Sequence, residues 1–249
     1  GFRRIITHTI DNINFSIDDF FDKSTLESEQ LITLKKALVE IHRPKSMNTL
    51  NLSIKRLKFN EHFFMQLLMA IKKSNYKKNK TKQFTSKDNY VSKIYKLLPF
   101  NLTNSQIRVL KEIRADLESS NPMNRLIQGD VGSGKTIVAI LASAIAIDNT
   151  AQVAIMAPTE ILAEQHFNSF KSYCDKIDVT CELLISDIKK KEKEKIIGDL
   201  RSGDINIIVG THALIQENIE FKNLGLSIID EQHRFGVVHR KNLIKKAKD

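Results

Sequence analysis

The sequence predicts an α/β fold with a parallel sheet over residues 96–249, preceded by a mainly helical, basic connector over residues 1–95. Two observations lead to this prediction. From about residue 96 onward, short apolar runs alternate with stretches of helical spacing, which is typical of parallel strands covered by helices on both faces. A glycine-rich phosphate-loop pattern also stands between the first of these runs and the helix expected after it.

The connector contains two stretches of helical spacing. Apolar residues recur in helical register at Leu31, Leu34, Leu38 and Ile41, and again at Leu57, Phe64, Leu68 and Ile71. Pro44 ends the first stretch, because proline cannot continue a helix. Residues 74–89 are polar, rich in Lys and Asn and without periodicity, so we expect an exposed loop there.

The second part alternates between expected strands and expected helices. The candidate strands are the apolar runs at residues 125–128, 152–157, 181–185, 205–209 and 226–229. Helices are expected near residues 135–148, 160–175 and 187–201, with a weaker one at residues 212–217.

The charge of the chain is unevenly distributed. The net charge is +10, from 39 Lys and Arg residues against 29 Asp and Glu residues. Between residues 54 and 82 the only acid is Glu61, and the basic residues are Lys55, Arg56, Lys58, Lys72, Lys73, Lys77, Lys78, Lys80 and Lys82. This stretch suits a polyanion such as nucleic acid, although a solvated basic surface explains it equally well. Its Phe59, Phe63 and Phe64 are expected in the core rather than stacked on bases.

Cysteine use and hydropathy bear on location. Cys174 and Cys181 have no histidine cluster beside them, so we expect neither a zinc site nor a disulfide, and a reducing cytoplasm suits them. The longest apolar run, residues 137–147, is shorter than the roughly 20 residues that a membrane span needs. We therefore expect a cytoplasmic protein with no membrane partner. The first residue is not Met, which suggests a fragment of a longer chain.

The first chemical motif is the phosphate loop at residues 129–136. It consists of Gly129, Asp130, Val131, Gly132, Ser133, Gly134, Lys135 and Thr136, and it matches the pattern G-x-x-x-x-G-K-[ST] at every fixed position. The glycines let backbone N–H groups surround phosphate oxygens, and the following helix directs its positive end to the same place. The loop is therefore a candidate ATP site, in which Lys135 reaches the β- and γ-phosphates and the Thr136 hydroxyl binds Mg²⁺.

The second motif is an acid pair, Asp230 and Glu231, directly after the apolar run at residues 226–229. Ligands of open parallel sheets bind at the carboxyl ends of the strands, which is where this pair is expected. Asp230 is the candidate Mg²⁺ ligand, and Glu231 is the candidate for polarising the attacking water. The two motifs together predict an enzyme that hydrolyses ATP.

At these motifs the sequence resembles superfamily 2 helicases, and most closely the RecG family of bacterial branched-DNA helicases. The similar segments are residues 98–106, 128–136, 157–166, 210–214 and 230–237. The motif-rich resemblance covers about residues 97–240. Residues 41–44 and the helical stretch after them also resemble, less specifically, the segment before the family's motor.

This resemblance implies a first RecA-like motor lobe, preceded by the connector that follows a DNA-binding wedge domain. It implies that ATP hydrolysis with Mg²⁺ drives movement on branched or duplex DNA, so that stalled replication forks and Holliday junctions are remodelled in recombination and repair. The second lobe, which supplies the arginine finger in this family, is not in this chain. The chain alone is therefore expected to bind MgATP weakly and to turn over little.

The resemblance also implies roles for single residues. Gln106 and Phe100 match positions that contact adenine, although Gln106 also completes a helix-capping box with Thr103, and Phe100 also suits a buried residue before that helix. The residues that match DNA-contact motifs are Thr159, Glu160, Gln165, Thr211 and His212. A plain helix cap is the alternative for Thr159. His233 matches the residue that couples the nucleotide to DNA.

Residues 238–241 depart from the RecG pattern and are more similar to the transcription-repair coupling factor, whose motor is related. Two alternatives therefore stay open: the motor of such a factor, and a lobe that binds nucleotide or DNA without turnover of its own.

Overall fold

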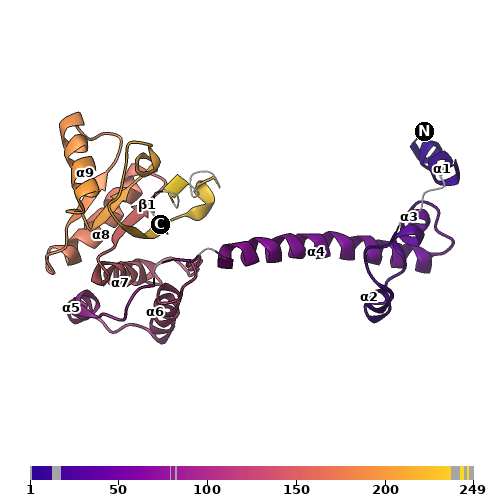
Figure 1. Cartoon of the computed structure of the whole chain (residues 1–249), viewed down its shortest axis with the longest axis horizontal. Helices are drawn as coiled ribbons and strands as arrows, with labels where there is room; N and C mark the ends of the chain where they lie inside the picture. The colour runs from indigo at the N-terminus through magenta and orange to yellow at the C-terminus, as the bar shows by residue number, and fades with distance from the viewer. Residues whose placement is uncertain are drawn as a thin grey trace. The chain divides into compact units, whose positions relative to one another are not determined.

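The computed structural model of the chain describes residues 2–12, 18–78, 80–81, 83–236, 242–243 and 246. The chain divides into two compact units, Gly1–Tyr76 and Lys77–Asp249 (Figure 1). The first unit is helical and the second is built from helices and parallel strands. The predicted fold class, an α/β lobe preceded by a mainly helical region, is therefore confirmed.

The helical unit consists of α1 (Phe2–Asn12), α2 (Lys23–Ser28), α3 (Leu34–His42) and α4 (Met47–Lys78). Both helices expected in the connector are present, and α3 ends before Pro44. α4 continues to Lys78, so the loop expected over residues 74–89 is wrong in its first part. Neither Pro nor Gly interrupts residues 47–78, and a helix that has already formed is easily extended by further residues.

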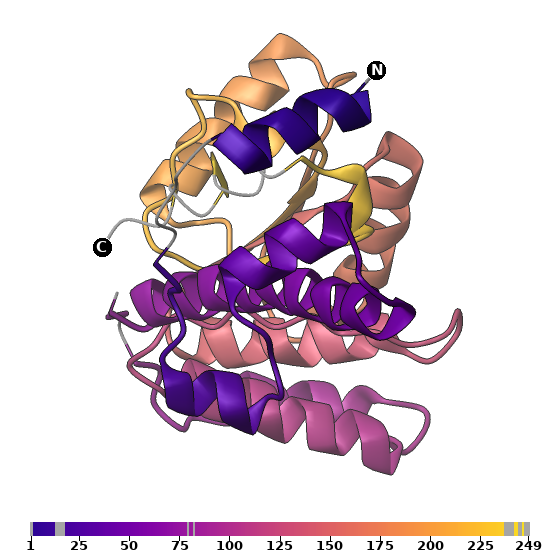
Figure 2. The same cartoon turned by 90° about the vertical axis from the view of Figure 1, so that its right-hand side faces the viewer.

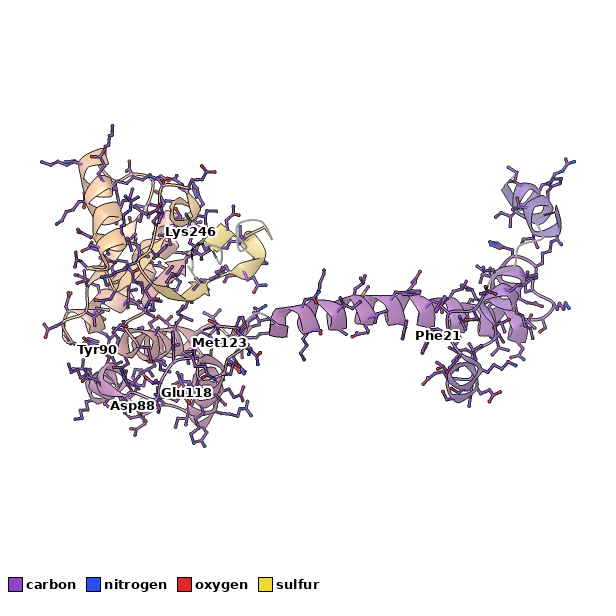
Figure 3. The ribbon with its side chains drawn as sticks, viewed as in Figure 1. Phe21, Asp88, Tyr90, Glu118, Met123 and Lys246 are labelled. Atoms are coloured by element: carbon purple, nitrogen blue, oxygen red, sulfur yellow. The ribbon has the colours of Figure 1, made fainter. Side chains whose placement is uncertain are left out.

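Aromatic rings from the middle of α4 pack around Phe21, which is labelled in Figure 3. The ring centroids of Phe21 and Phe63 lie 4.8 Å apart, and those of Phe20 and Phe64 lie 4.9 Å apart, within the range of favourable aromatic pairs. Phe59 lies at the edge of the same cluster, 5.5 Å from Phe21. The phenylalanines of the basic stretch thus pack against other rings of the unit, but Phe63 and Phe64 remain 37% and 44% exposed, so the expectation that they lie in the core is wrong for these two.

Arg56 is fully buried among these rings. Its guanidinium carbon lies 4.8 Å from the centre of the Phe21 ring, and it pairs with Asp19 at 2.6 Å and donates to the Ile32 carbonyl at 3.2 Å. Arg56 was counted in the basic stretch of the sequence, but it is not part of a basic surface. Its side chain is buried and its charge is paired with Asp19 inside the unit. Of that stretch, Lys82 and the side chains of Lys77 and Lys78 lie outside what the structure describes.

The carboxyl group of Asp19 has a lowered pKa. Its burial acts to raise the pKa, but hydrogen bonds donated by the Leu34 N–H, by Arg56 and by the Phe21 N–H outweigh the burial. The pKa of Glu40 is lowered as well, chiefly by the backbone N–H of Lys45. Such carboxylates stabilise the folded state above their unfolded pKa, and this stabilisation is lost as the pH falls through the folded pKa.

We therefore expect the helical unit to lose stability as the pH falls below about 4, the ordinary range of these groups. Hydrogen exchange of α2, α3 and α4 in the full-length protein, followed from pH 6 to pH 3 (about the range in which carboxyl groups titrate) and corrected for the intrinsic rate, measures this loss. In Asp19→Asn the dependence on pH should be weaker, with Glu40 and Asp22, whose pKa is lowered by hydrogen bonds from Thr25, supplying what remains. An equally steep dependence in Asp19→Asn would show that this carboxylate is not responsible.

The α/β unit is organised around a four-stranded parallel sheet in the order β2-β3-β1-β4. Its strands are β1 (Gln152–Met156), β2 (Cys181–Leu184), β3 (Ile207–Gly210) and β4 (Leu224–Ile229). The helices α7 (Lys135–Asp148), α8 (Glu160–Cys174) and α9 (Lys190–Ser202) confirm the main helical predictions. The weaker helix expected at residues 212–217 is a short 3-10 helix, η1 (His212–Ile215).

Both faces of the sheet are covered. Val153 and Ile155 of β1 belong to a core that includes α5 (Asn89–Leu97), α6 (Asn104–Leu117), α7 and α8. The alternate residues Ala154 and Met156 belong to a second core, which includes α9. Side chains alternate between the faces of a strand, so these two cores lie on opposite sides of the sheet, as Figures 1 and 2 show for α7 and α9.

The first expected strand, residues 125–128, is not a strand in the structure. Leu126 is 71% exposed, and Arg125 forms ion pairs with Glu112 and Asp116 of α6, at 2.5 and 2.7 Å. The sequence pattern was misleading because Leu126 and Ile127 are the only apolar residues of this run, and a strand also needs a paired neighbour, which this segment lacks within the described ranges. The segment enters the phosphate loop as irregular chain.

The chain between α4 and α5 is bound to the α/β unit. The backbone N–H groups of Thr81 and Phe84 donate to the carbonyls of Ser120 and Leu117, each at 3.0 Å. Thr85 donates to the Asn149 side chain at 2.7 Å, and the Phe84 ring packs against the core. These contacts place residues 81–95 with the second unit, so the division at Tyr76 lies nearer the N-terminus than the change of composition at residue 95.

Candidate nucleotide site

The carboxyl ends of three neighbouring strands meet at one edge of the sheet. The Asp230 backbone N–H, directly after β4, donates to the Met156 carbonyl at the end of β1. The Ala157 N–H, after β1, donates to the Gly210 carbonyl at the end of β3. The segments after these strands therefore begin side by side, at the edge where ligands of open α/β sheets bind.

The phosphate loop leads directly into α7, which begins at Lys135. Gly132 and Gly134 have backbone φ angles of 80° and 79°, which other residues rarely adopt. The Lys135 ammonium group folds back over the loop and donates to the carbonyls of Gly129 and Asp130, each at 2.8 Å. Most of the loop is exposed, and Val131 is fully exposed. A positive helix end, backbone N–H groups and an ammonium group thus lie together in reach of solvent, which suits a phosphate chain.

Gln106 connects α6 to the phosphate loop. Its side-chain oxygen accepts from the Thr103 backbone N–H at 2.9 Å, and the Thr103 hydroxyl accepts from the Gln106 N–H, so the expected capping box is confirmed. Its amide nitrogen donates to the Ser133 carbonyl at 3.0 Å. An amide group has a second hydrogen and further lone pairs, so these bonds leave it capacity for contact with a base. Phe100 is 50% exposed, which contradicts the alternative that it is a buried residue before this helix.

The two loop glycines offer a matched pair of substitutions. A Cβ at Gly134 would lie 2.3 Å from the Gln106 amide nitrogen, whereas a Cβ at Gly132 would meet nothing within 4 Å, and both residues have positive φ. We expect Gly132→Ala to lower affinity for a fluorescent ATP analogue by less than about tenfold, since backbone strain of this kind costs about 1 kcal/mol. Gly134→Ala should lower it substantially further, because the bond from Gln106 to Ser133 must also break. Equal losses in the two variants would argue against a role for this contact.

The two residues of the acid pair, Asp230 and Glu231, have different partners. An Asp230 carboxylate oxygen, Oδ2, lies 2.8 Å from Nε2 of His166 on α8. Glu231 has a left-handed backbone, with φ 48° and ψ 53°, and its carboxylate lies 3.3 Å from Nδ1 of His233. The left-handed backbone turns Glu231 sharply after the strand, and such strain in a non-glycine residue is often found at functional sites. The interaction of His166 with Asp230 was not expected from the sequence, where His166 appeared only as the last residue of a motif.

The residues matched to DNA-contact motifs differ in their availability. The Thr159 hydroxyl accepts from the Leu162 N–H and caps α8, and a Glu160 carboxylate oxygen accepts from the Ser186 N–H. Gln165 and His212 are exposed. Thr211 is only 1% exposed and its hydroxyl has no partner, so its side chain is not presented for a DNA contact in this arrangement.

The side chains predicted to bind magnesium, Thr136 of the phosphate loop and Asp230 after β4, fit a nucleotide-bound ion better than a metal held by protein alone. Within the described part of the chain, no group of three or more His, Cys, Asp or Glu side chains is placed to hold a metal ion. Mg²⁺ typically binds through one or two protein groups together with substrate phosphates, and Thr136 and Asp230 offer a hydroxyl and a carboxylate of that kind. Residues 237–241, which include part of the last motif, lie outside the described residues.

Two smaller expectations can be compared with the structure. Cys174 and Cys181 are buried free thiols in the structure. Among the described residues, no helix combines the length and hydrophobicity that a membrane crossing requires.

Comparison with known proteins places this geometry in a family. Residues 103–249 match the DEAD/DEAH box helicase family. The ATP-dependent DNA helicase RecG of Aquifex aeolicus is 41% identical over 252 residues, covering 99% of this chain and 32% of that protein. The proteins of the same name from Bacillus subtilis and Thermotoga maritima are each 43% identical over 248 residues, covering 99% of this chain and 36% and 32% of their own lengths.

A solved structure of RecG bound to a three-way DNA junction is also similar. It has a TM-score of 0.80 and 41% identity, and the match covers 94% of this chain and 32% of that one. The chain therefore spans about a third of the length of these relatives. The resemblance to RecG that the motifs suggested is confirmed by these matches. With its phosphate loop and acid pair in place, the chain belongs to the DEAD/DEAH box helicase family.

Proposed function

We propose that this chain is the connector and first motor lobe of an ATP-dependent DNA helicase of the RecG type, which remodels stalled replication forks and Holliday junctions. The observation that carries the proposal is the phosphate loop at the start of α7, with the Lys135 ammonium group held over it. The similarity to RecG over 99% of the chain supports the choice of family. The cytoplasmic location expected from the sequence stays a prediction.

The proposed roles follow the position of each group. Residues 129–134 surround the phosphates with backbone N–H groups, and Lys135 exchanges its bonds to Gly129 and Asp130 for the β- and γ-phosphates of ATP. Thr136 and Asp230 hold Mg²⁺, which when bound neutralises the charge that develops on the phosphates. Glu231 orients the attacking water, and His233, beside it, links this site to bound DNA. Gln106 and Phe100 contact the adenine.

DNA is proposed to contact the same unit through the helix that follows β1. Thr159 and Glu160 at the start of α8, Gln165 one turn further and His212 in η1 are the proposed contacts to the DNA backbone. Contacts of this kind position a protein on DNA without reading sequence. The exposed lysines of α4, Lys58, Lys72 and Lys73, are proposed to bind phosphates, so DNA affinity should fall steeply with salt.

The test is ATP hydrolysis by the full-length protein with a forked DNA, a linear duplex and no DNA. The fastest hydrolysis with the fork supports a branch-specific helicase. Equal stimulation by linear duplex would favour the motor of a transcription-repair coupling factor. Equal rates with and without DNA would contradict both, and would favour a lobe that binds without DNA-dependent turnover. The isolated chain should hydrolyse little ATP, since ATP in such motors is hydrolysed between two lobes; rapid hydrolysis dependent on Lys135 would contradict this.

A further inference from the structure

We propose that His166 is a positioning residue for Asp230: it fixes the orientation of the Asp230 carboxylate and so connects helix α8 to the magnesium site. This inference rests on the proposed function, in which Asp230 is a Mg²⁺ ligand. It adds a residue from outside the phosphate loop and the acid pair to the machinery of ATP hydrolysis.

The geometry of the pair is that of a strong hydrogen bond. His166 Nε2 lies 2.8 Å from Asp230 Oδ2, and the two side chains are 20% and 33% exposed, so both are largely shielded from water. A carboxylate only accepts hydrogen bonds, so in the proposed arrangement Nε2 of His166 is the donor. Charge-assisted bonds of this kind are roughly twice as strong as neutral ones.

The bond with His166 occupies one carboxylate oxygen of Asp230 and leaves the other one available to a ligand. Oδ2 is occupied by His166, while Oδ1 makes no hydrogen bond within the part of the chain that the structure describes. The backbone of Asp230 is fixed as well, because its N–H donates to the Met156 carbonyl at 2.9 Å. With its backbone and one oxygen held, the carboxylate presents Oδ1 in one direction. Groups that orient a metal ligand in this way typically change metal affinity or activity by about 10- to 100-fold when they are removed.

His166 also belongs to the helix whose start carries the proposed DNA contacts. α8 begins at Glu160 with Thr159 as its cap, so His166 lies less than two turns from that end. A helix moves as a rigid element, and a displacement of its first turn by DNA therefore reaches His166 and the carboxylate it holds. The bond is thus a direct connection between the surface proposed for DNA and the magnesium site.

The experiment compares two amide variants of the full-length protein. Gln has an amide nitrogen that reaches nearly as far as Nε2 of histidine, whereas the shorter Asn does not reach Asp230. The first readout is the Mg²⁺ concentration at which a fluorescent ATP analogue is half bound, measured without DNA and without turnover. The second is kcat and KM for ATP with forked DNA. Asn168→Ala, an exposed change on the same helix, is the matched control.

We expect His166→Asn to require about tenfold more Mg²⁺ and to lower kcat by about 10- to 100-fold with a smaller change in KM. His166→Gln should retain most of the Mg²⁺ affinity and most of kcat, and Asn168→Ala should resemble the unmodified protein. If His166 contributed only through the packing of its side chain, the two amide variants would show similar losses. Either equal losses or no loss in either variant would therefore overturn the role of His166.

A separate variant distinguishes failure of this inference from failure of the proposed function. If Asp230→Asn leaves the Mg²⁺ requirement unchanged, then Asp230 is not a magnesium ligand, and the part of the proposed function on which the inference rests is wrong. If Asp230→Asn abolishes the Mg²⁺ dependence while His166→Asn has no effect, the proposed function survives and the inference about His166 fails.

Discussion

Replacement of Lys135 by alanine should reduce ATP hydrolysis by the full-length protein at least about 100-fold, the scale found when one electrostatic contact to a developing charge is removed. The ammonium group donates two bonds of 2.8 Å to the carbonyls of Gly129 and Asp130 in the loop. Its removal takes away the charge proposed to meet the β- and γ-phosphates. It also takes away the bonds that hold the loop when those phosphates are absent.

This prediction is measured as kcat and KM for ATP with saturating forked DNA. Lys111→Ala is the control, because Lys111 is an exposed lysine of α6 and its removal changes the net charge equally. DNA affinity at low ATP should be nearly unchanged in Lys135→Ala, which excludes a general loss of fold. Activity of Lys135→Ala within a few-fold of the unmodified protein would contradict the assignment of the phosphate loop.

The second large effect is on stability. Arg56→Met should destabilise the helical unit by about 3 kcal/mol or more, because removing one member of a buried ion pair leaves the other charge without a partner. Arg56 is fully buried, pairs with Asp19 at 2.6 Å and contacts the rings of Phe20 and Phe21. The replacement roughly preserves volume, but it leaves the Asp19 carboxylate without its counter-charge, held only by the N–H groups of Phe21 and Leu34, and removes the bond to the Ile32 carbonyl.

Hydrogen exchange in the full-length protein measures this effect where it occurs. A loss of about 3 kcal/mol corresponds to roughly 100-fold faster exchange in α2, α3 and the first half of α4, with the α/β unit unaffected. Lys58→Met is the matched control, since Lys58 lies on the same helix and is exposed. A second change, Asp19→Asn in the Arg56→Met background, should recover part of the loss. Unchanged exchange in Arg56→Met would show that this pair does not hold the unit together.

Consecutive residues were enough to predict much of the lobe. The apolar runs that became β1, β2, β3 and β4 and the helices α7, α8 and α9 all follow from local spacing, since periodicity reflects which side of an element is buried. The phosphate loop follows from eight adjacent positions, because its chemistry depends on glycine conformations and on the helix that begins directly after it. The capping box of Thr103 and Gln106 is local in the same way.

Local patterns were misleading where a distant partner decided the outcome. Residues 125–128 read as a strand, but α6 holds Arg125 and no neighbouring strand pairs with them in the described ranges. Part of the polar stretch 74–89 continues α4, and part is bound by Ser120, Leu117 and Asn149. Nothing in the composition of these segments indicates those partners.

Two contacts belong to the tertiary structure alone. Arg56 counted as surface charge in the sequence, yet it is neutralised by Asp19, 37 residues away, inside an aromatic cluster. His166 meets Asp230 across 64 residues because the parallel sheet brings the end of β4 beside the helix that follows β1. The sequence by itself determined the four strands of the sheet and the three main helices of the lobe, and it indicated the residues proposed to bind phosphate. The packing of those elements determined which charges are buried and which side chain holds the acid at the site, since both depend on contacts between segments far apart in the chain.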